Sequence, residues 1–225
     1  MPIFVDNFTG VDGTLLQNRT SASGHTWTLV FQDAAGNDFL LNASNQLIQQ
    51  GGLNAGMIYS ANGTYTSSDY FIQVNMVTLA TDNTDPIFLF VRQTDVDNMY
   101  AVRIGGQGGT NTCQLYKKVT GTWTALGSAF NPPANGSIIK LEIIGSILTF
   151  YDDGASLATA TDTDLTSIGK AGLGAGGGAE LILSGDDSSG NSVLDNLIVQ
   201  LAGVSLGYLK PNKLRPAIFT PGIAR

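Results

Sequence analysis

Residues 70–80 read YFIQVNMVTLA, and bulky apolar side chains alternate here with polar ones. Val74 and Met76 alternate with Gln73 and Asn75, so one side of the chain is apolar and the other is largely polar. Successive side chains of a β-strand point to opposite faces, and this period of two is typical of a strand with one face in a core. The stretch therefore predicts a long strand in an antiparallel sheet that is half exposed to water.

Similar runs recur along the chain, separated by turns rich in Asp, Asn and Gly. The runs SIIKLEIIG and ILTFYDD flank Gly145-Ser146, which predicts a two-residue β-hairpin. No segment keeps the 3.6-residue apolar period of a helix, so we expect about twelve strands and no helix. The first and last strands, near Val5 and Leu197, are expected to pair and seal the domain. This spacing of strands and turns is typical of an all-β, antiparallel two-sheet β-sandwich or jelly roll.

The composition agrees with a turn-rich β-protein. The 225 residues include 28 glycines, and the 43% hydrophobic share is sufficient for a core. Asp, which favours turns, far outnumbers Glu, which favours helix interiors. The single Cys113 excludes an intrachain disulfide and is expected to be a small buried residue. The start of the chain lacks a signal-peptide pattern and no apolar run is long enough to span a membrane, so we expect synthesis in a cytoplasm without export.

The end of the chain differs in charge from the rest. Residues 1–200 carry all 18 acidic groups, whereas residues 201–225 carry four basic groups and no acid. Pro211, Pro216 and Pro221 favour an extended arm, because proline cannot donate to a β-ladder and restricts the residue before it. We therefore expect a sandwich over 1–200 and an anchoring arm over 201–225. The arm residues expected to dock on an acidic protein surface are Tyr208, Lys210, Lys213, Leu214, Arg215, Phe219 and Arg225.

The order of several segments is similar to that of a known superfamily. The segments are DNFTGVDGTLLQNRT, YFIQVNMV, PIFLFVRQTDVDNMYAVRI, QLYKKVTGTWTALG, IIKLEIIGSILTFYDDG and VLDNLIV, within residues 3–200. Together they resemble the concanavalin A-like lectin/glucanase superfamily in its laminin G-like branch. The resemblance implies a laminin G-like β-sandwich. It does not fix the function, because the superfamily includes lectins, adhesion modules, glycosidases and viral surface domains.

The last thirteen residues, KLRPAIFTPGIAR at 213–225, resemble the C-terminal arms of tailed-phage virion structural proteins. This second resemblance implies a virion location and capsid or other virion proteins as partners.

The chemistry of a glycosidase is not evident. Such an enzyme of this fold needs two carboxylates about 5–9 Å apart, and the Glu-X-Asp-X-X-Glu strand of the β-glucan-cleaving members is absent. Glu142 and Glu180 occur singly on expected strands, with Lys140 on the same face as Glu142. His25 is the only histidine, and Ser23 near it lacks the Gly-X-Ser-X-Gly elbow of a serine hydrolase. The sequence therefore predicts no enzyme.

Calcium is the one metal considered, because Asp and Asn supply the oxygen ligands that it prefers. The alternative for each aspartate is a turn-capping role. The candidates are Asp95 and Asp97 in TDVDN, Asp186 and Asp187 in SGDDSSGNS, and Asp6 with Asp195 on the terminal strands. For sugar binding, the candidate aromatic platforms are Trp123, Tyr116, Tyr100, Tyr65 and Tyr151, with Trp27 expected in the core and Trp123 either at an edge or in the core.

Three classes of function remain. The favoured one is a capsid decoration (cement) protein or head-fibre component whose C-terminal arm docks on the particle. The second is a host-recognition lectin of a phage tail or baseplate, with a cell-surface glycan as ligand, and the third is a bacterial carbohydrate-binding module. A homo-oligomer is possible in each class. The acidic body argues against a nucleic-acid partner, and no membrane partner is expected.

Overall fold

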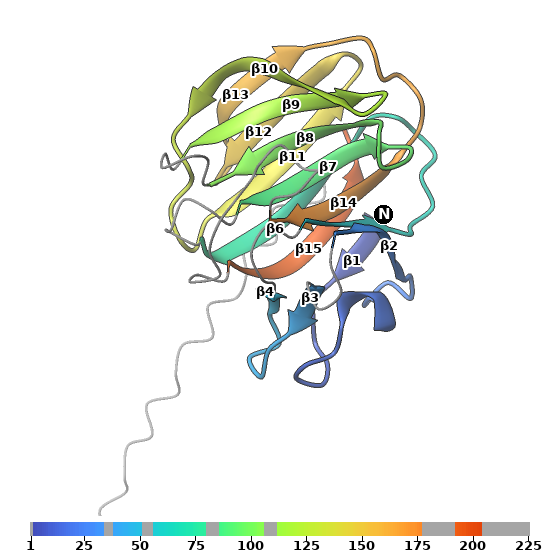
Figure 1. Cartoon of the computed structure of the whole chain (residues 1–225), viewed down its shortest axis with the longest axis vertical. Coiled ribbons are helices and arrows are strands. Elements are labelled where there is room, and N and C mark those ends of the chain that lie inside the picture. Colours follow the sequence, from blue (N-terminus) through green and yellow to red (C-terminus); the bar gives the residue numbers. More distant parts are fainter. Residues whose placement is uncertain are drawn as a thin grey trace, which may run out of the picture.

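The structure is a computed structural model that describes residues 2–33, 38–50, 56–79, 86–105, 112–176 and 192–203. Within them the chain forms two antiparallel β-sheets and one short 3-10 helix, η1 (Leu16–Asn18). Figure 1 shows the two sheets stacked as layers. The predicted antiparallel two-sheet β-sandwich is therefore confirmed. In the part of the chain described, no helix is long and apolar enough to cross a membrane.

One sheet has eight strands and the other has seven. The eight-stranded sheet runs β13 (Ala155–Thr161), β12 (Ile147–Asp152), β11 (Ile138–Ile144), β6 (Tyr70–Thr78), β15 (Val193–Leu201), β4 (Leu47–Gln50) and β3 (Asp38–Leu41), with β1 (Pro2–Asp6) also paired to β15. The seven-stranded sheet runs β10 (Thr122–Phe130), β9 (Cys113–Val119), β8 (Met99–Ile104), β7 (Ile87–Gln93), β14 (Lys170–Ala175), β5 (Met57–Ala61) and β2 (Trp27–Gln32).

The alternation that predicted a strand at 70–80 has the expected structural result. In β6, Ile72, Val74 and Met76 are buried, whereas the residues between them are only partly buried. β11 and β12 form the predicted hairpin around Gly145-Ser146, with Ile144 paired to Ile147. The sequence pattern therefore determined which face of the eight-stranded sheet enters the core.

The two ends of the described chain pair as predicted. β1 lies antiparallel to β15, with Val5 opposite Ile198 and Asp6 opposite Leu197. β4 pairs with the start of β15, through Val193 and Leu194, so β1 and β4 share one side of that strand. The last strand thus ties the amino terminus to the centre of the sheet.

A continuous apolar core fills the space between the sheets. Trp27 and Cys113 belong to it, as predicted, with 3% and 0% of their surface exposed. Other members include Phe4, Tyr59, Tyr70, Leu89, Val102, Leu141, Phe150 and Leu173.

A second apolar cluster lies on the other face of the seven-stranded sheet. Ile58, Phe88 and Phe90 alternate along their strands with core residues, so they point away from the core. With Met99 and Ala101 they form a cluster that has no exposed surface. The Phe88 and Phe90 rings are therefore not accessible to a soluble ligand.

β14 explains why one strand is rich in glycine. A Cβ at Gly174 would lie 2.6 Å from the Phe90 ring, and one at Gly172 would collide with the Tyr59 carbonyl oxygen. Only glycine permits neighbouring groups to approach so closely. Close packing therefore requires glycine at these two positions of the GLGAGGG stretch.

Three strands were not predicted from the sequence. β3 and β4 have four residues each, too short for a clear alternation. β13 is an edge strand of small and polar residues, in which most side chains are exposed. Because burial on one face creates the alternating pattern, a strand with little burial leaves no such pattern.

Candidate ligand-binding site

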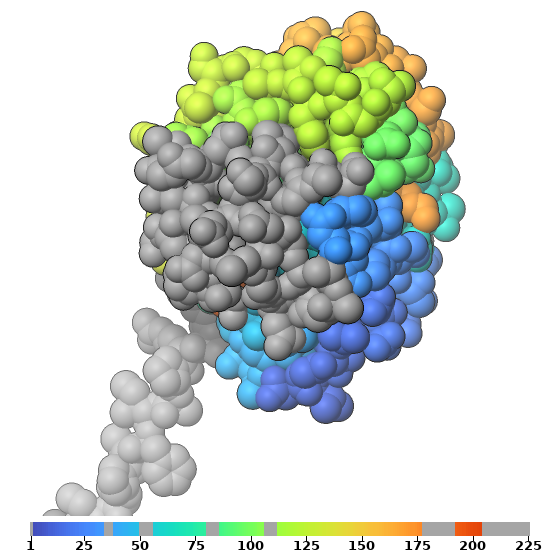
Figure 2. All heavy atoms as spheres, viewed as in Figure 1, coloured from blue at the N-terminus to red at the C-terminus, as the bar shows by residue number. Residues whose placement is uncertain are grey.

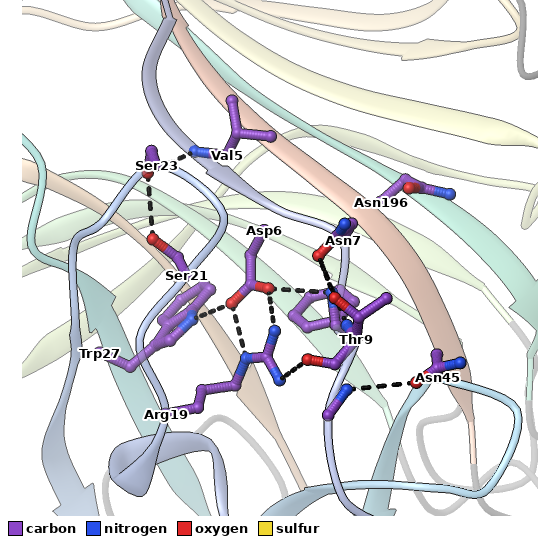
Figure 3. A network of polar contacts seen from close by, with 12 residues as sticks. Val5, Asp6, Asn7, Thr9, Arg19, Ser21, Ser23, Trp27, Asn45 and Asn196 are labelled. Carbon is purple, nitrogen blue, oxygen red and sulfur yellow. Dashed lines mark hydrogen bonds and ion pairs between the residues drawn. The ribbon is translucent and has the colours of Figure 1, made fainter.

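The predicted calcium ligand Asp6 is fully used in an internal network (Figure 3). Its Oδ1 accepts from the backbone N–H of Phe8 at 2.9 Å and from Arg19 at 2.5 Å. Its Oδ2 accepts from Arg19 Nε at 3.0 Å and from the indole N–H of Trp27 at 2.9 Å. Asp195 bonds instead to the backbone and side-chain nitrogens of Asn196. Both aspartates thus have hydrogen-bond partners within the protein, which favours a structural role for them over a shared cation.

Of the candidates Asp95 and Asp97, the first caps its turn and the second forms an ion pair. Asp95 accepts from the backbone N–H of Asp97 at 2.8 Å and from the Asn98 amide at 2.9 Å. Asp97 forms an ion pair with Lys118 at 3.8 Å. Across the described ranges, no three His, Cys, Asp or Glu side chains gather as a metal site. Asp186 and Asp187 lie outside these residues.

The carboxylate Glu142 is held by its neighbours. Lys140 donates to one oxygen at 3.1 Å, as the sequence predicted, and the Tyr151 hydroxyl donates to the other at 2.9 Å. Glu180 lies outside the described residues. The His25 ring stacks on Phe4, at 6.2 Å between ring centroids.

Most predicted aromatic platforms cannot receive a sugar. Tyr100 is fully buried, so that prediction is wrong, and Tyr116 is 8% exposed. Lys140 covers the Tyr151 ring, with its Nζ 3.9 Å from the ring centroid. Trp123 on the edge strand β10 is half-buried against Phe88 and Tyr116. Tyr65 differs from these, because it lines a pocket.

This pocket lies where β7 ends and β14 begins, at the rim of the seven-stranded sheet. Gln93 and Lys170 are paired across the two strands there, and Tyr65 follows β5 in the chain. We call it the rim pocket. Its lining residues are Tyr65, Gln93, Thr94, Ile168, Gly169 and Lys170, and its volume is about 340 Å³. In Figure 2 the teal, green and orange segments that contribute to it meet at the right of the view.

Two tyrosines, the partly buried Tyr65 and the fully buried Tyr70, fix the inner wall of the rim pocket. The Tyr65 hydroxyl donates to the Ala61 carbonyl at 3.1 Å and accepts from the Ala171 N–H at 3.0 Å. The Tyr70 hydroxyl donates to the Gly169 carbonyl at 3.0 Å. Burial raises the pKa of both tyrosines, so their hydroxyls stay protonated and keep donating.

Arg92 holds the loops around the rim pocket. Its buried guanidinium donates to the carbonyls of Ser68, Leu165 and Gly145, at 3.0, 2.8 and 2.7 Å. The backbone at Gly169 approaches Arg92 so closely that a Cβ there would collide with it. Three loops far apart in sequence are thus fixed around one buried cation, which makes the rim pocket preorganised.

Gln93, a buried lining residue of the rim pocket, has a hydrogen-bond donor that is not used. Gln93 is 3% exposed, and its Oε1 accepts from the Ser60 hydroxyl at 2.5 Å. Among the described residues, no acceptor bonds to its Nε2. A buried donor without a partner is costly and rare, so an acceptor on a bound ligand or on water would complete it.

The predicted docking residues of the C-terminal arm lie outside the described residues. They are Tyr208, Lys210, Lys213, Leu214, Arg215, Phe219 and Arg225. All described strands end at or before Leu201.

No protein-family profile and no curated protein matches the chain. Its structure is similar to a carbohydrate-binding module from Bacillus subtilis (TM-score 0.55, 14% identity, covering 77% of this chain and 94% of that one). It is also similar to a β-1,3-glucanase from Mycobacterium marinum (TM-score 0.59, 13% identity, covering 88% of this chain and 98% of that one). A third similar structure is a protein of unknown function with a galectin-like fold from Bacillus subtilis (TM-score 0.58, 12% identity, covering 85% of this chain and 97% of that one).

These likenesses show the jelly-roll β-sandwich fold, which the sequence predicted. The similar structures include a glucanase and a carbohydrate-binding module, and at these identities they establish no catalytic role.

Proposed function

We propose that the chain is a non-enzymatic glycan-binding β-sandwich whose ligand occupies the rim pocket. The observation that carries this proposal is the rim pocket itself, whose lining combines the buried Gln93 with the apolar side chain of Ile168. A sugar ring can bind both groups, because its oxygens accept hydrogen bonds from an amide and its C–H groups form an apolar face that packs on isoleucine. Small-molecule sites combine apolar walls with a few placed polar groups in the same way.

Binding is favoured over hydrolysis by the surroundings of the carboxylates. Glu142 is bonded to Lys140 and Tyr151, and the pair Asp162 and Asp164 shares the single ammonium of Lys117, at 2.5 and 2.6 Å. A glycosidase instead needs two carboxylates that face each other across the scissile bond. Similarity in fold to a carbohydrate-binding module gives coarse support to the same proposal.

The test compares two exposed isoleucines. Ile168 in the rim pocket is 52% exposed, and Ile147 on the β11–β12 hairpin is 48% exposed. Ile168→Ser is expected to weaken binding to an array of mono- and oligosaccharides by about tenfold, since the lost apolar contact is worth about 1–1.5 kcal/mol. Ile147→Ser is the matched control and should bind as the wild type does. Equal binding by both variants would place the ligand elsewhere, and no binding by the wild type would refute the proposal.

A second proposal concerns residues 201–225 and rests on their sequence. The acidic body and the basic, proline-containing arm have opposite charges, as a docking peptide on an acidic partner requires. We propose that the arm attaches the sandwich to a phage virion, as a capsid decoration protein, a head-fibre component or a host-recognition lectin. Apolar side chains such as Phe219 would supply most of the affinity, and ion pairs through residues such as Lys213 would add little.

The virion proposal is tested by mass spectrometry of purified particles and by attachment assays. Phe219→Ala should weaken attachment more than Lys213→Ala does. Raised salt should reduce attachment only partly. Absence of the protein from particles would exclude a virion role.

A further inference from the structure

We infer that the rim pocket selects sugars that carry a carboxylate, such as a terminal uronic acid. This inference rests on the proposed glycan-binding function and adds the class of ligand. It follows from two lining residues that carry nitrogen donors, the buried Gln93 and the exposed Lys170, which differ in charge.

The buried donor requires an acceptor from the ligand. Because Gln93 Oε1 already accepts from Ser60, the amide is oriented with its nitrogen as the group left to bind. No described residue supplies the acceptor. Hydroxyl and carboxylate oxygens both meet this requirement, so Gln93 selects oxygen-rich ligands without requiring charge.

The exposed donor adds the preference for charge. Lys170 Nζ donates to the neutral amide oxygen of Asn62 at 2.7 Å, and no carboxylate of the described residues forms an ion pair with it. Five of the other described cations, Arg19, Arg92, Lys117, Lys118 and Lys140, each form an ion pair with an acid. Lys170 therefore presents a charge that a ligand carboxylate can neutralise.

Among the acidic residues, Asp95 lies closest in sequence to a lining residue of the rim pocket, because it directly follows Thr94. Its carboxylate already accepts from Asn98 and from the N–H of Asp97, and it does not line the rim pocket. The attraction to Lys170 is therefore not balanced by a carboxylate in the lining.

The size of the rim pocket limits the ligand. About 340 Å³ is at the low end of the roughly 300–1,000 Å³ of small-molecule sites. The ligand is therefore a chain end of one or two rings, with its apolar face on Ile168.

The experiment uses pairs of sugars that differ only in the C6 group. Methyl glucuronoside is compared with methyl glucoside, and methyl galacturonoside with methyl galactoside, by calorimetry or ligand-observed NMR on the full chain. The acidic member of at least one pair is expected to bind about fivefold tighter, the upper range for one partly exposed ion pair. Raised salt should reduce this advantage.

Two lysine variants test whether the tighter binding of the acidic sugar depends on Lys170. Lys170→Gln removes the charge at an exposed position and should make the acidic and neutral members of each pair bind equally. Lys140→Gln removes the same charge from the β11 face and should leave the preference unchanged. Gln93→Glu replaces the buried donor by a carboxylate and should weaken the acidic sugar more than the neutral one, with thermal melts confirming that the variant folds.

Each outcome decides the inference. Equal binding of the acidic and neutral sugars overturns the carboxylate preference and leaves glycan binding intact. A preference that survives Lys170→Gln, or that disappears in Lys140→Gln, also overturns it. Failure of every sugar to bind refutes both this inference and the proposed function.

Discussion

Replacing Asp6 by Asn should destabilise the sandwich strongly. The carboxylate has no exposed surface and accepts four hydrogen bonds, two of them from Arg19. An asparagine keeps one oxygen, but its NH₂ group would face two donors, either Arg19 Nε and the Trp27 indole or an Arg19 Nη and the Phe8 N–H. Arg19 is only 7% exposed, so its charge would remain buried without an anionic partner.

The expected magnitude follows from that buried charge. Removing one partner of a buried ion pair costs about 3–5 kcal/mol, which corresponds to a fall in Tm of about 6–20 °C in a chain of this size. Asp164→Asn is the control, since its half-exposed carboxylate pairs with Lys117 at the surface and its loss should have a much smaller effect.

The assay is a double-mutant cycle by urea unfolding and thermal melts, with Asp6→Asn, Arg19→Met and both together. Because Arg19→Met removes the stranded charge, the double variant should be more stable than the sum of the single effects predicts, by at least about 1 kcal/mol. A loss below about 1 kcal/mol in Asp6→Asn, or additive effects in the cycle, would refute the view that this buried pair stabilises the terminal strands.

Four further results are expected. Burial raises the pKa of the Cys113 thiol to about 12, so a thiol reagent at pH 8 should label the protein only after unfolding; rapid native labelling would contradict this. Burial, opposed by hydrogen bonds from Tyr59 and from the Phe39 N–H, raises the pKa of Asp38 above 3.8, so its stabilising protonated form is lost as the pH rises through that pKa. The Tm of Asp38→Asn relative to the wild type should therefore increase between pH 3 and pH 7, and a constant difference would oppose this. EDTA should change the Tm by no more than about 2 °C, because Asp95 is already hydrogen-bonded; a fall of many degrees would reveal a cation site. β-Glucans should not be hydrolysed, and any activity lost in Glu142→Gln would show that the chain is an enzyme.

The sequence predicted the parts of the fold that depend on local pattern. The alternation around Val74 and the Gly145-Ser146 turn are local features, and the structure contains the strand and the hairpin that they predict. The pairing of the terminal strands was also predicted, although it joins Val5 to Ile198. β13 was missed because it is largely exposed and its residues are small.

The rim pocket could not be predicted in the same way. Tyr65, Gln93 and Ile168 come from three segments, and only the sheet order brings them together. Tyr65 was among the sugar-binding candidates. Gln93 was not, because in the sequence it is simply a polar residue at the end of an apolar strand. The available signal was Arg92-Gln93, a pair of polar residues that ends a run of five apolar ones and that the structure places at 2% and 3% exposure.

The two proposals meet at one end of the sandwich. Leu201 pairs with Tyr70, and the Ala202 N–H donates to the Asp69 carbonyl at 3.0 Å, so the described chain ends beside the wall of the rim pocket. An arm of about twenty residues, if extended, reaches about 60–70 Å, whereas a nine-residue strand such as β6 is about 30 Å long. An anchoring arm is therefore long enough to leave the rim pocket open to solvent on a particle.

Deletion of residues 208–225 should accordingly separate the two functions. Because the described strands all end by Leu201, the truncated protein should melt within about 2 °C of the full chain and bind glycans equally well, yet fail to attach to the particle. Particles that carry the full-length protein should bind the same sugars as the isolated protein does. Unfolding of the truncated body would show that residues 208–225 belong to the sandwich and would refute the anchor. Loss of glycan binding with an unchanged melt would instead show that these residues complete the rim pocket.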